Sequence, residues 1–115
     1  MKYKRVFISL PMKGKSDEDI QQDLMKAKKV YEAANLNGDS VQFCHNHDPQ
    51  IRALYCGAKE EYEGVWYLGK AFQAMSKCDE VFFYGDWESA KGCVFEHAVC
   101  VEYGIPFTTE KLLKE

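Results

Sequence analysis

Short apolar runs that alternate with helical patterns are the feature of this sequence that most restricts its fold. The runs occupy residues 6–10, 41–44 and 80–84, and residues 105–108 can form a last strand. Helical stretches separate them and no hairpin turn joins them, so right-handed crossovers and a parallel sheet are expected. The predicted fold class is α/β: a small three-layer sandwich with a parallel, Rossmann-like (flavodoxin-like) sheet of about four to five strands.

The first predicted helix has the clearest start and end signals. Ser16 is a good N-cap, and three acidic residues follow it where negative charge meets the positive end of the helix dipole. Asn37-Gly38 is predicted to end the helix, because glycine suits the left-handed position after a helix. Apolar residues between these ends recur at spacings of three and four: Ile20, Leu24, Ala27, Tyr31 and Ala34.

The helical patterns after the second strand differ in strength. Residues 51–67 have the least clear pattern and indicate helical pieces and a loop, whereas residues 67–77 have helical spacing. A further helix is predicted from Gly92 to about Tyr103, with Gly104 closing it. The sequence after residue 108 predicts a short terminal helix or tail.

Composition limits the classes of partner and location. The 115 residues predict a single domain, 1–115, and 46% hydrophobic with 29% charged residues is typical of a soluble globular protein. A formal charge of −3 argues against a nucleic-acid polymer as partner. No apolar stretch approaches a membrane span or a signal peptide, and five cysteines without a C-x-x-C pair indicate reduced thiols. We therefore expect a cytoplasmic protein without a membrane partner.

Two loops that follow predicted strands are candidate ligand sites. Ligands of open parallel sheets bind outside the carboxyl ends of the strands, where residues 9–14 and 85–92 are expected. Both loops lead into helix N-termini, which favour anions. Ser89 could donate a hydrogen bond to phosphate, and Gly92 would let the backbone approach it closely. The alternative is that these are turn residues only.

Two acids are candidates for chemistry. Glu96 lies in the opening turn of the predicted third helix, where an acid often serves only to complement the helix dipole. Its apolar neighbours, however, predict that much of this helix is buried and that Glu96 lies near the strand ends: Val94, Phe95, Ala98 and Val99. A buried carboxylate there needs a partner or a task. Asp79, just before the third strand, is the second candidate, with a turn residue as the alternative.

Other residues favour ordinary structural roles. His45 and His47 would point to opposite sides of an extended segment, so a loop or ligand-contact role is preferred over a metal site. Cys93 and His97 could form a catalytic pair, but Glu96 explains the region better. The aromatic residues that could stack on a nucleobase or pack in the core are Trp87, Tyr84 and Trp66, with Trp87 preferred as the ligand neighbour.

Three segments together resemble the nucleoside 2-deoxyribosyltransferase-like family, which includes 2′-deoxynucleoside 5′-monophosphate N-glycosidases and short uncharacterised phage and bacterial members. They are V-F-I-S-L-P-M-K-G, S-K-C-D-E-V and S-A-K-G-C-V-F-E-H-A-V-C-V-E-Y-G-I-P. The last is the most specific, with a Ser, a Gly-containing turn, a Glu and a later Gly-x-Pro. The resemblance spans most of the chain apart from residues 41–67.

The resemblance implies a role for each candidate residue. Glu96 would be the nucleophile, and Asp79 an acid that handles the base or its protonation. The residues it implies for substrate binding are Ser9, Pro11, Met12 and Gly14 around the sugar and base, and Gly85, Trp87, Ser89 and Gly92 around the phosphate or near the ligand. No metal and no cofactor is implied. The chain departs from the family at Phe7, where several transferases have a tyrosine that orients the nucleophile, and also at Leu10 and His97.

The activity implied is hydrolysis of the N-glycosidic bond of a 2′-deoxynucleoside 5′-monophosphate through a glycosyl-enzyme on Glu96. Two alternatives stay open: a deoxyribosyltransferase that exchanges bases, and a non-catalytic module that binds or senses a nucleotide. The expected ligand is thus a small deoxynucleotide or nucleoside. Family members assemble as dimers or larger, so a homodimer or higher homo-oligomer is expected.

Overall fold

The computed structural model describes residues 3–35 and 40–113. Its strands are β1 (Tyr3–Ser9), β2 (Ser40–Cys44), β3 (Glu80–Phe83) and β4 (Phe107–Thr109). Its helices are α1 (Asp17–Ala34), α2 (Pro49–Ala53), α3 (Glu63–Met75), α4 (Lys91–Tyr103) and α5 (Glu110–Leu113). Short 3₁₀ helices, η1 (Glu60–Tyr62) and η2 (Trp87–Ser89), precede α3 and α4.

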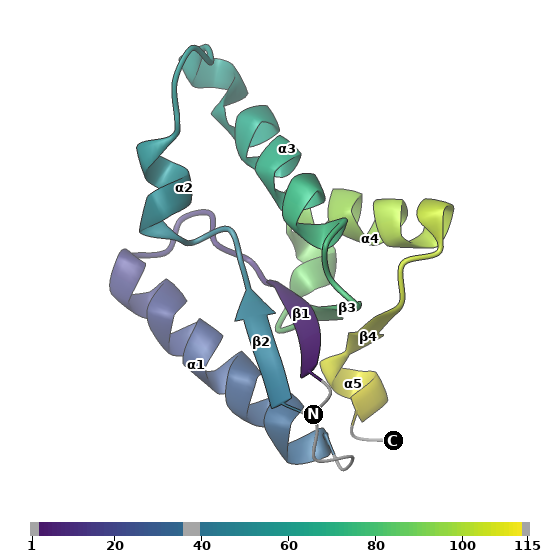
Figure 1. The fold of residues 1–115 in the computed structure, drawn as a ribbon. Helices are drawn as coiled ribbons and strands as arrows, with labels where there is room; N and C mark the ends of the chain where they lie inside the picture. Colours follow the sequence, from purple (N-terminus) through teal and green to yellow (C-terminus); the bar gives the residue numbers. More distant parts are fainter. Residues whose placement is uncertain (1–2, 36–39, 114–115) are drawn as a thin grey trace.

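The four strands form one parallel sheet in the order β2-β1-β3-β4 (Figure 1). This confirms the α/β class and the parallel sheet predicted from the alternating pattern. The chain first steps from β1 to β2 and then crosses back over β1 to β3, so the strand order reverses between β1 and β3. In open α/β sheets a ligand crevice forms at this reversal, outside the carboxyl ends of the strands.

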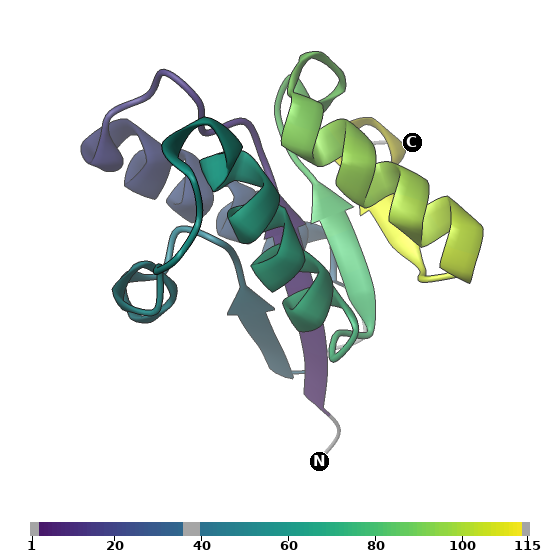
Figure 2. The same ribbon diagram turned by 90° about the horizontal axis from the view of Figure 1, so that it is seen from above.

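Helices cover both faces of the sheet, and alternate strand residues pack into two cores. Figure 2 shows α1 on one side of the strands and α3 and α4 on the other. Val6, Ile8 and Phe82 pack against α1, whereas Phe7 and Phe83 pack on the side of α3 and α4. Because side chains alternate along a strand, Ser9 lies on the same face as Phe7. That face is the one covered by α4.

The start of α1 agrees with its sequence signals. The Ser16 hydroxyl accepts a hydrogen bond from the Asp19 backbone N–H, which confirms Ser16 as the N-cap. The predicted stripe is buried at Ile20, Leu24, Ala27 and Tyr31, while Ala34 is half-buried. The predicted stop at residues 37–38 lies outside the described residues.

The region from residue 51 to residue 77 contains more helix than its pattern predicted. α3 begins at Glu63, four residues before the predicted start, and ends at Met75. Gly64 lies within its first turn, so this glycine does not interrupt the helix. Tertiary contacts outweigh the helix cost of glycine here, because Tyr67 stacks on Tyr55 and Trp66 packs edge-on against both.

The prediction that much of this helix, α4, would be buried was wrong. Only Cys93, Glu96 and Cys100 of this helix are buried, and they share the side that packs on the sheet. Val94 and Phe95 are exposed, at 44% and 48% of their surfaces. Gly104 ends the helix in the left-handed conformation, at φ 69°, as predicted. In the described part of the chain, no helix is both long and apolar enough to cross a membrane.

Candidate functional site

A cavity of about 570 Å³ opens at the carboxyl end of β1, beside the reversal of strand order. The loop after β1, the first turn of α4 and the N-terminal half of α3 form its walls. The cavity is lined by six predicted site residues, five from the two loops and the predicted nucleophile: Ser9, Pro11, Met12, Ser89, Gly92 and Glu96. The structure therefore brings together most of the residues on which the sequence argument depended.

The centre of the cavity wall is a hydrogen bond between Ser9 and Glu96. Ser9 ends β1, and Glu96 is the sixth residue of α4, 87 positions later in the chain. The Ser9 hydroxyl donates to Glu96 Oε1 at 2.6 Å, and the two residues are only 2% and 7% exposed. No acid occupies the first turn of α4, so the expectation that Glu96 lies in that turn was wrong. Helix-dipole complementation is therefore a poor explanation for this carboxyl group.

Burial makes the Glu96 carboxyl group a weaker acid than usual. Burial raises the pKa of Glu96 to about 7, and the hydrogen bond from Ser9 opposes this rise by favouring the charged form. Burial also raises the pKa of the neighbouring Cys93 thiol to about 11 and, together with the nearby Glu96 charge, that of Cys100 to about 11. Near neutral pH, the Glu96 carboxyl group is therefore partly ionised, whereas the two thiols stay protonated.

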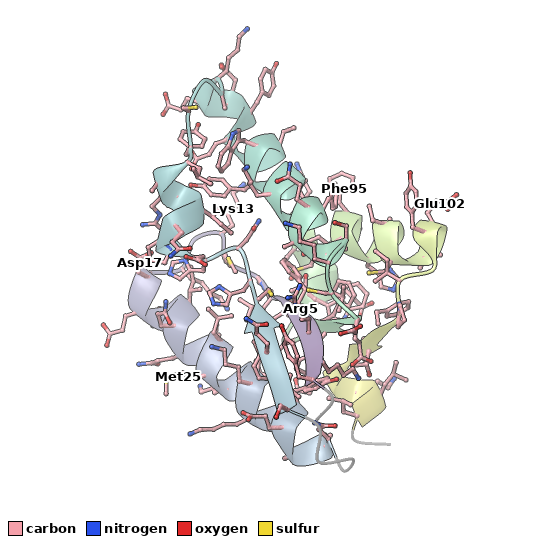
Figure 3. All side chains as sticks on the ribbon, viewed as in Figure 1. Arg5, Lys13, Asp17, Met25, Phe95 and Glu102 are labelled. Carbon is pink, nitrogen blue, oxygen red and sulfur yellow. The ribbon has the colours of Figure 1, made fainter. Side chains whose placement is uncertain are left out.

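The start of α4 forms one end of the cavity and carries positive character. No side chain caps this helix, and the first backbone N–H group bonded within it belongs to Val94. Gly92 and Cys93 line the cavity at these unpaired positions, together with the lysines Lys91 and Lys13. Figure 3 places Lys13 in the space between α2 and α3. An anion at this end of the cavity would meet backbone N–H groups of the first turn of α4 and the side chain of Lys91.

Ser89 lines the cavity but its hydroxyl group is already engaged. Its Oγ lies 2.8 Å from Asp86 Oδ2 and 2.9 Å from the Asp86 carbonyl oxygen. A phosphate at Ser89 would have to displace the carboxylate from this hydroxyl group. Ser89 also borders a second cavity of about 260 Å³, which Gly85 lines with Tyr84; Pro11 lines both cavities.

Three predicted ligand neighbours lie outside the main cavity. Gly14 sits in an exposed turn with φ 80°, and Gly85 adopts φ 72° beside Pro11. Trp87 packs instead against Phe83 and stacks on His97, with ring centroids 4.8 Å apart. His97 also contacts Phe107, so the role of this unexpected histidine is aromatic packing. No hydrogen bond joins His97 to Cys93 within the described ranges.

The structure does not bring Asp79 to Glu96. Asp79 precedes β3 at the amino end of the sheet, where its carboxylate accepts the Arg5 backbone N–H at 2.8 Å and its own N–H donates to the Arg5 carbonyl. Ser9 lies four residues further along β1, which corresponds to about 13 Å in a strand. Within one chain, Asp79 therefore performs the structural task of joining β1 to β3.

Four residues outside the predicted site complete the cavity: Asn46, from the segment expected to be a loop or ligand contact, and Gly64, Tyr67 and Leu68 of α3. Asn46 follows β2, and its side-chain N–H donates to the Tyr67 carbonyl oxygen at 2.7 Å, which ties the loop after β2 to α3. The carboxyl end of β2 was an available signal, because ligand loops follow strands at this edge. The position of α3 over this edge had no comparable signal in the sequence.

The histidines that flank Asn46 do not line the cavity. His45 Nδ1 accepts the backbone N–H of His47, and His47 Nε2 lies 3.6 Å from Asp17 Oδ1, next to α2 (Figure 3). Burial lowers the pKa of His45. Among the described residues no three histidine, cysteine or acidic side chains gather in a way that could hold a metal ion.

Comparison with protein-family models, with curated proteins and with solved structures finds no match to this chain. The relation to the deoxyribosyltransferase-like family therefore stays a prediction that rests on the three quoted segments. The geometry of the cavity is an independent basis for a functional proposal.

Proposed function

We propose that this protein is an N-glycosidase that hydrolyses a 2′-deoxynucleoside 5′-monophosphate with Glu96 as the nucleophile. The observation that carries the proposal is the environment of Glu96. One carboxylate oxygen is fixed by Ser9 in a cavity of about 570 Å³ that also holds the uncapped start of α4. A cavity of this size, with few polar groups in an apolar wall, suits a small-molecule ligand.

The anionic end of the substrate is assigned to the start of α4. The uncapped first turn of α4, where Gly92 lines the cavity beside Lys91, favours a phosphate there. The base is assigned to the opposite wall, where Tyr67 and Leu68 of α3 offer apolar surface. The anomeric carbon then lies between the two, at Glu96.

The chemistry is a double displacement at C1′ of the sugar. A Glu96 oxygen attacks C1′ while the bond from C1′ to the base nitrogen breaks, and the bonding electron pair leaves with the base. Water then attacks C1′, loses a proton and releases the Glu96 carboxylate, which yields deoxyribose 5-phosphate and the free base. Glu96 is the only carboxyl group among the described residues that line the cavity, so the departing base takes its proton from water.

Base release from a substrate panel tests this function. The four 2′-deoxynucleoside 5′-monophosphates and the matching nucleosides are incubated with the protein, and free base is measured by chromatography. We expect release from a monophosphate without an added acceptor base. Release only when an acceptor base is present would instead identify a transferase, and no release from any compound would reject the enzyme.

A non-catalytic nucleotide-binding module is the second candidate. It is favoured by the position of Asp79, which leaves the described cavity wall without a second acid for the leaving base. Replacing Glu96 with Ala separates the two candidates. A binder keeps its affinity for the monophosphate and has no base release to lose, whereas the enzyme loses base release.

A homo-oligomer is proposed on the basis of the exposed side of α4. Val94, Ala98 and Val101 recur at helical spacing and are exposed, and Phe95 lies beside them, projecting away from the strands in Figure 3. A second copy of the chain would bury this stripe. Light scattering measures the mass, and a dimer that dissociates in Val101→Glu would support the proposal, whereas a wild-type monomer would reject it.

A cytoplasmic location is proposed from the cysteines. All five are free thiols, and Cys93 and Cys100 are buried. Reduced thiols are typical of cytosolic proteins. Fractionation of expressing cells would test this location.

A further inference from the structure

We propose that Ser9 is a positioning residue that orients the Glu96 carboxylate, instead of a contact for the substrate. It holds Oε1 so that Oε2 faces the cavity. The catalytic consequence rests on the proposed function. The effect of Ser9 on the orientation and proton affinity of Glu96 does not, and it can be measured without any substrate.

The Ser9 hydroxyl group is committed to Glu96. A serine hydroxyl has a single proton to donate, and this one goes to Glu96 Oε1 at 2.6 Å. Both residues are almost fully buried, which limits competition from water for the bond. A bound sugar could therefore donate to Ser9 but could not receive its proton while the pair is intact.

The other oxygen of Glu96 is the one available for reaction. Oε2 makes no hydrogen bond or ion pair with any residue in the described ranges, and Glu96 forms part of the cavity wall. Among the described residues, Oε2 is not a fully buried polar atom without a partner, so it keeps some accessible surface. A carboxylate with one oxygen fixed and one free presents a single, defined lone-pair direction to a bound molecule.

No other described side chain performs this task. Phe7, which shares the face of β1 with Ser9, has no group that could donate a hydrogen bond. Cys93 and Cys100 of α4 keep their protons up to a pKa of about 11, and their proximity to Glu96 disfavours a second negative charge. Ser9 is thus the group that favours the charged form of Glu96 against burial.

The surroundings of Glu96 define what a pH titration would report. The thiols of α4 titrate well above neutral pH, and β1 contributes only the neutral Ser9. The lysines of the cavity wall, Lys13 and Lys91, are cations, and α3 contributes the phenol of Tyr67. The titration followed is that of Glu96, because burial raises its pKa to about 7.

The experiment compares Ser9→Ala and Ser9→Thr with the wild type and with Ser76→Ala. Ser76 is a matched control, because its hydroxyl donates to the Gln73 carbonyl oxygen at the exposed end of α3. The carboxyl carbon of Glu96 is titrated by NMR in protein with ¹³C-labelled glutamate, with Glu96→Gln used to assign its signal. Base release from the best monophosphate is measured from pH 5 to pH 9.

We expect Ser9→Ala to raise the pKa of Glu96 above its wild-type value and to lower kcat about 10- to 100-fold with KM nearly unchanged. The alkaline shift of the kcat/KM profile, which reports the free enzyme, should match the shift seen by NMR, and Ser9→Thr should restore both. An unchanged Glu96 titration in Ser9→Ala would overturn the proposal. If Ser9→Ala does not fold, Ser9→Cys, which keeps the volume but donates weakly, decides in the same way.

Failure of the proposed function has a different signature. If no substrate releases base, the NMR titration still shows whether Ser9 controls Glu96. An upward shift then keeps Ser9 as the positioning residue of a binding carboxylate, and no shift rejects it. Base release with a rise in KM and an unchanged kcat would identify Ser9 as a substrate contact and overturn the proposal.

Discussion

Two glutamates at opposite ends of the same sheet each accept a hydrogen bond from a hydroxyl group, yet their surroundings differ. At the amino end, Glu80 accepts from the Tyr31 hydroxyl and lies 3.1 Å from Lys4 Nζ. At the carboxyl end, Glu96 accepts from Ser9 and has no cation paired with it in the described chain. Glu80 has its charge satisfied by neighbours, whereas Glu96 keeps a free oxygen in a cavity.

The partners of Glu80 also respond to this network. Burial opposes a charge on Lys4, but its hydrogen bonds to Tyr31 and Glu80 outweigh burial and raise the pKa of Lys4. Burial, followed by the hydrogen bond to Glu80, raises the pKa of the Tyr31 phenol. These contacts stabilise a fixed arrangement. The contrast indicates that an incompletely satisfied carboxylate, and not an acid in general, marks the reactive end of the sheet.

The largest expected difference between the two ends is in activity. Glu96→Gln removes the nucleophile and should lower base release by about 10³-fold or more, while Glu80→Gln should change it only a few-fold. Chromatographic assay of both variants measures this, with Glu102→Gln on the exposed side of α4 as control. Equal losses in the Glu80 and Glu96 variants would contradict the assignment of separate roles.

The pH dependence of the free energy of unfolding should show that ionising Glu96, which activity requires, destabilises the folded protein. The pKa of Glu96 is raised from 4.5 to about 7, so the folded protein holds a proton that the unfolded chain releases between these values. Stability therefore falls as pH rises through this window, by about 3 kcal/mol above pH 7. Activity should rise over the same range, because the nucleophile must be ionised.

Urea unfolding of the wild type and Glu96→Gln at pH 5 and pH 8 measures this loss. From pH 5 to pH 8, the free energy of unfolding of the variant should rise by about 3 kcal/mol relative to that of the wild type. If the difference in free energy of unfolding between the wild type and Glu96→Gln is the same at both pH values, the pKa of Glu96 is not raised.

The anion end of the cavity offers a test of intermediate size. Lys91→Ala removes a cation beside the uncapped start of α4 and should raise KM for a monophosphate about 10-fold while leaving nucleosides nearly unaffected. Lys26→Ala, on the exposed side of α1, is the control. Equal effects on monophosphates and nucleosides would move the phosphate away from α4.

Asp79 should give the smallest effect, and in stability alone. Asp79→Ala leaves the Arg5 backbone N–H without its side-chain acceptor and should lower the free energy of unfolding by about 1 kcal/mol. Base release should stay within a few-fold of the wild type. A loss of 100-fold or more with the fold intact would restore Asp79 as a catalytic residue and bring the amino end of the sheet into the reaction.

The sequence by itself determined the elements and the chemistry available to them. The apolar runs before Pro11 and Gly85 are strands. The helix that starts near Ser16 has the predicted N-cap and buries the predicted apolar stripe. These signals are local, since they depend on spacings of two to four residues. They also identified Glu96 as an acid near the strand ends.

Only the tertiary structure decided which residues share the cavity. Ser9 meets Glu96 across 87 residues because Ser9 falls on the face of β1 that α4 covers, and because the buried side of α4 includes position 96. Because this side of α4 faces the sheet, Val94 and Phe95 on its other side are exposed, although they are apolar. Because β1 and β3 run parallel, Asp79, which precedes β3, lies at the opposite end of the sheet from Glu96. Spacing along a chain fixes which side a residue takes within its own element, but contact depends on how separate elements pack.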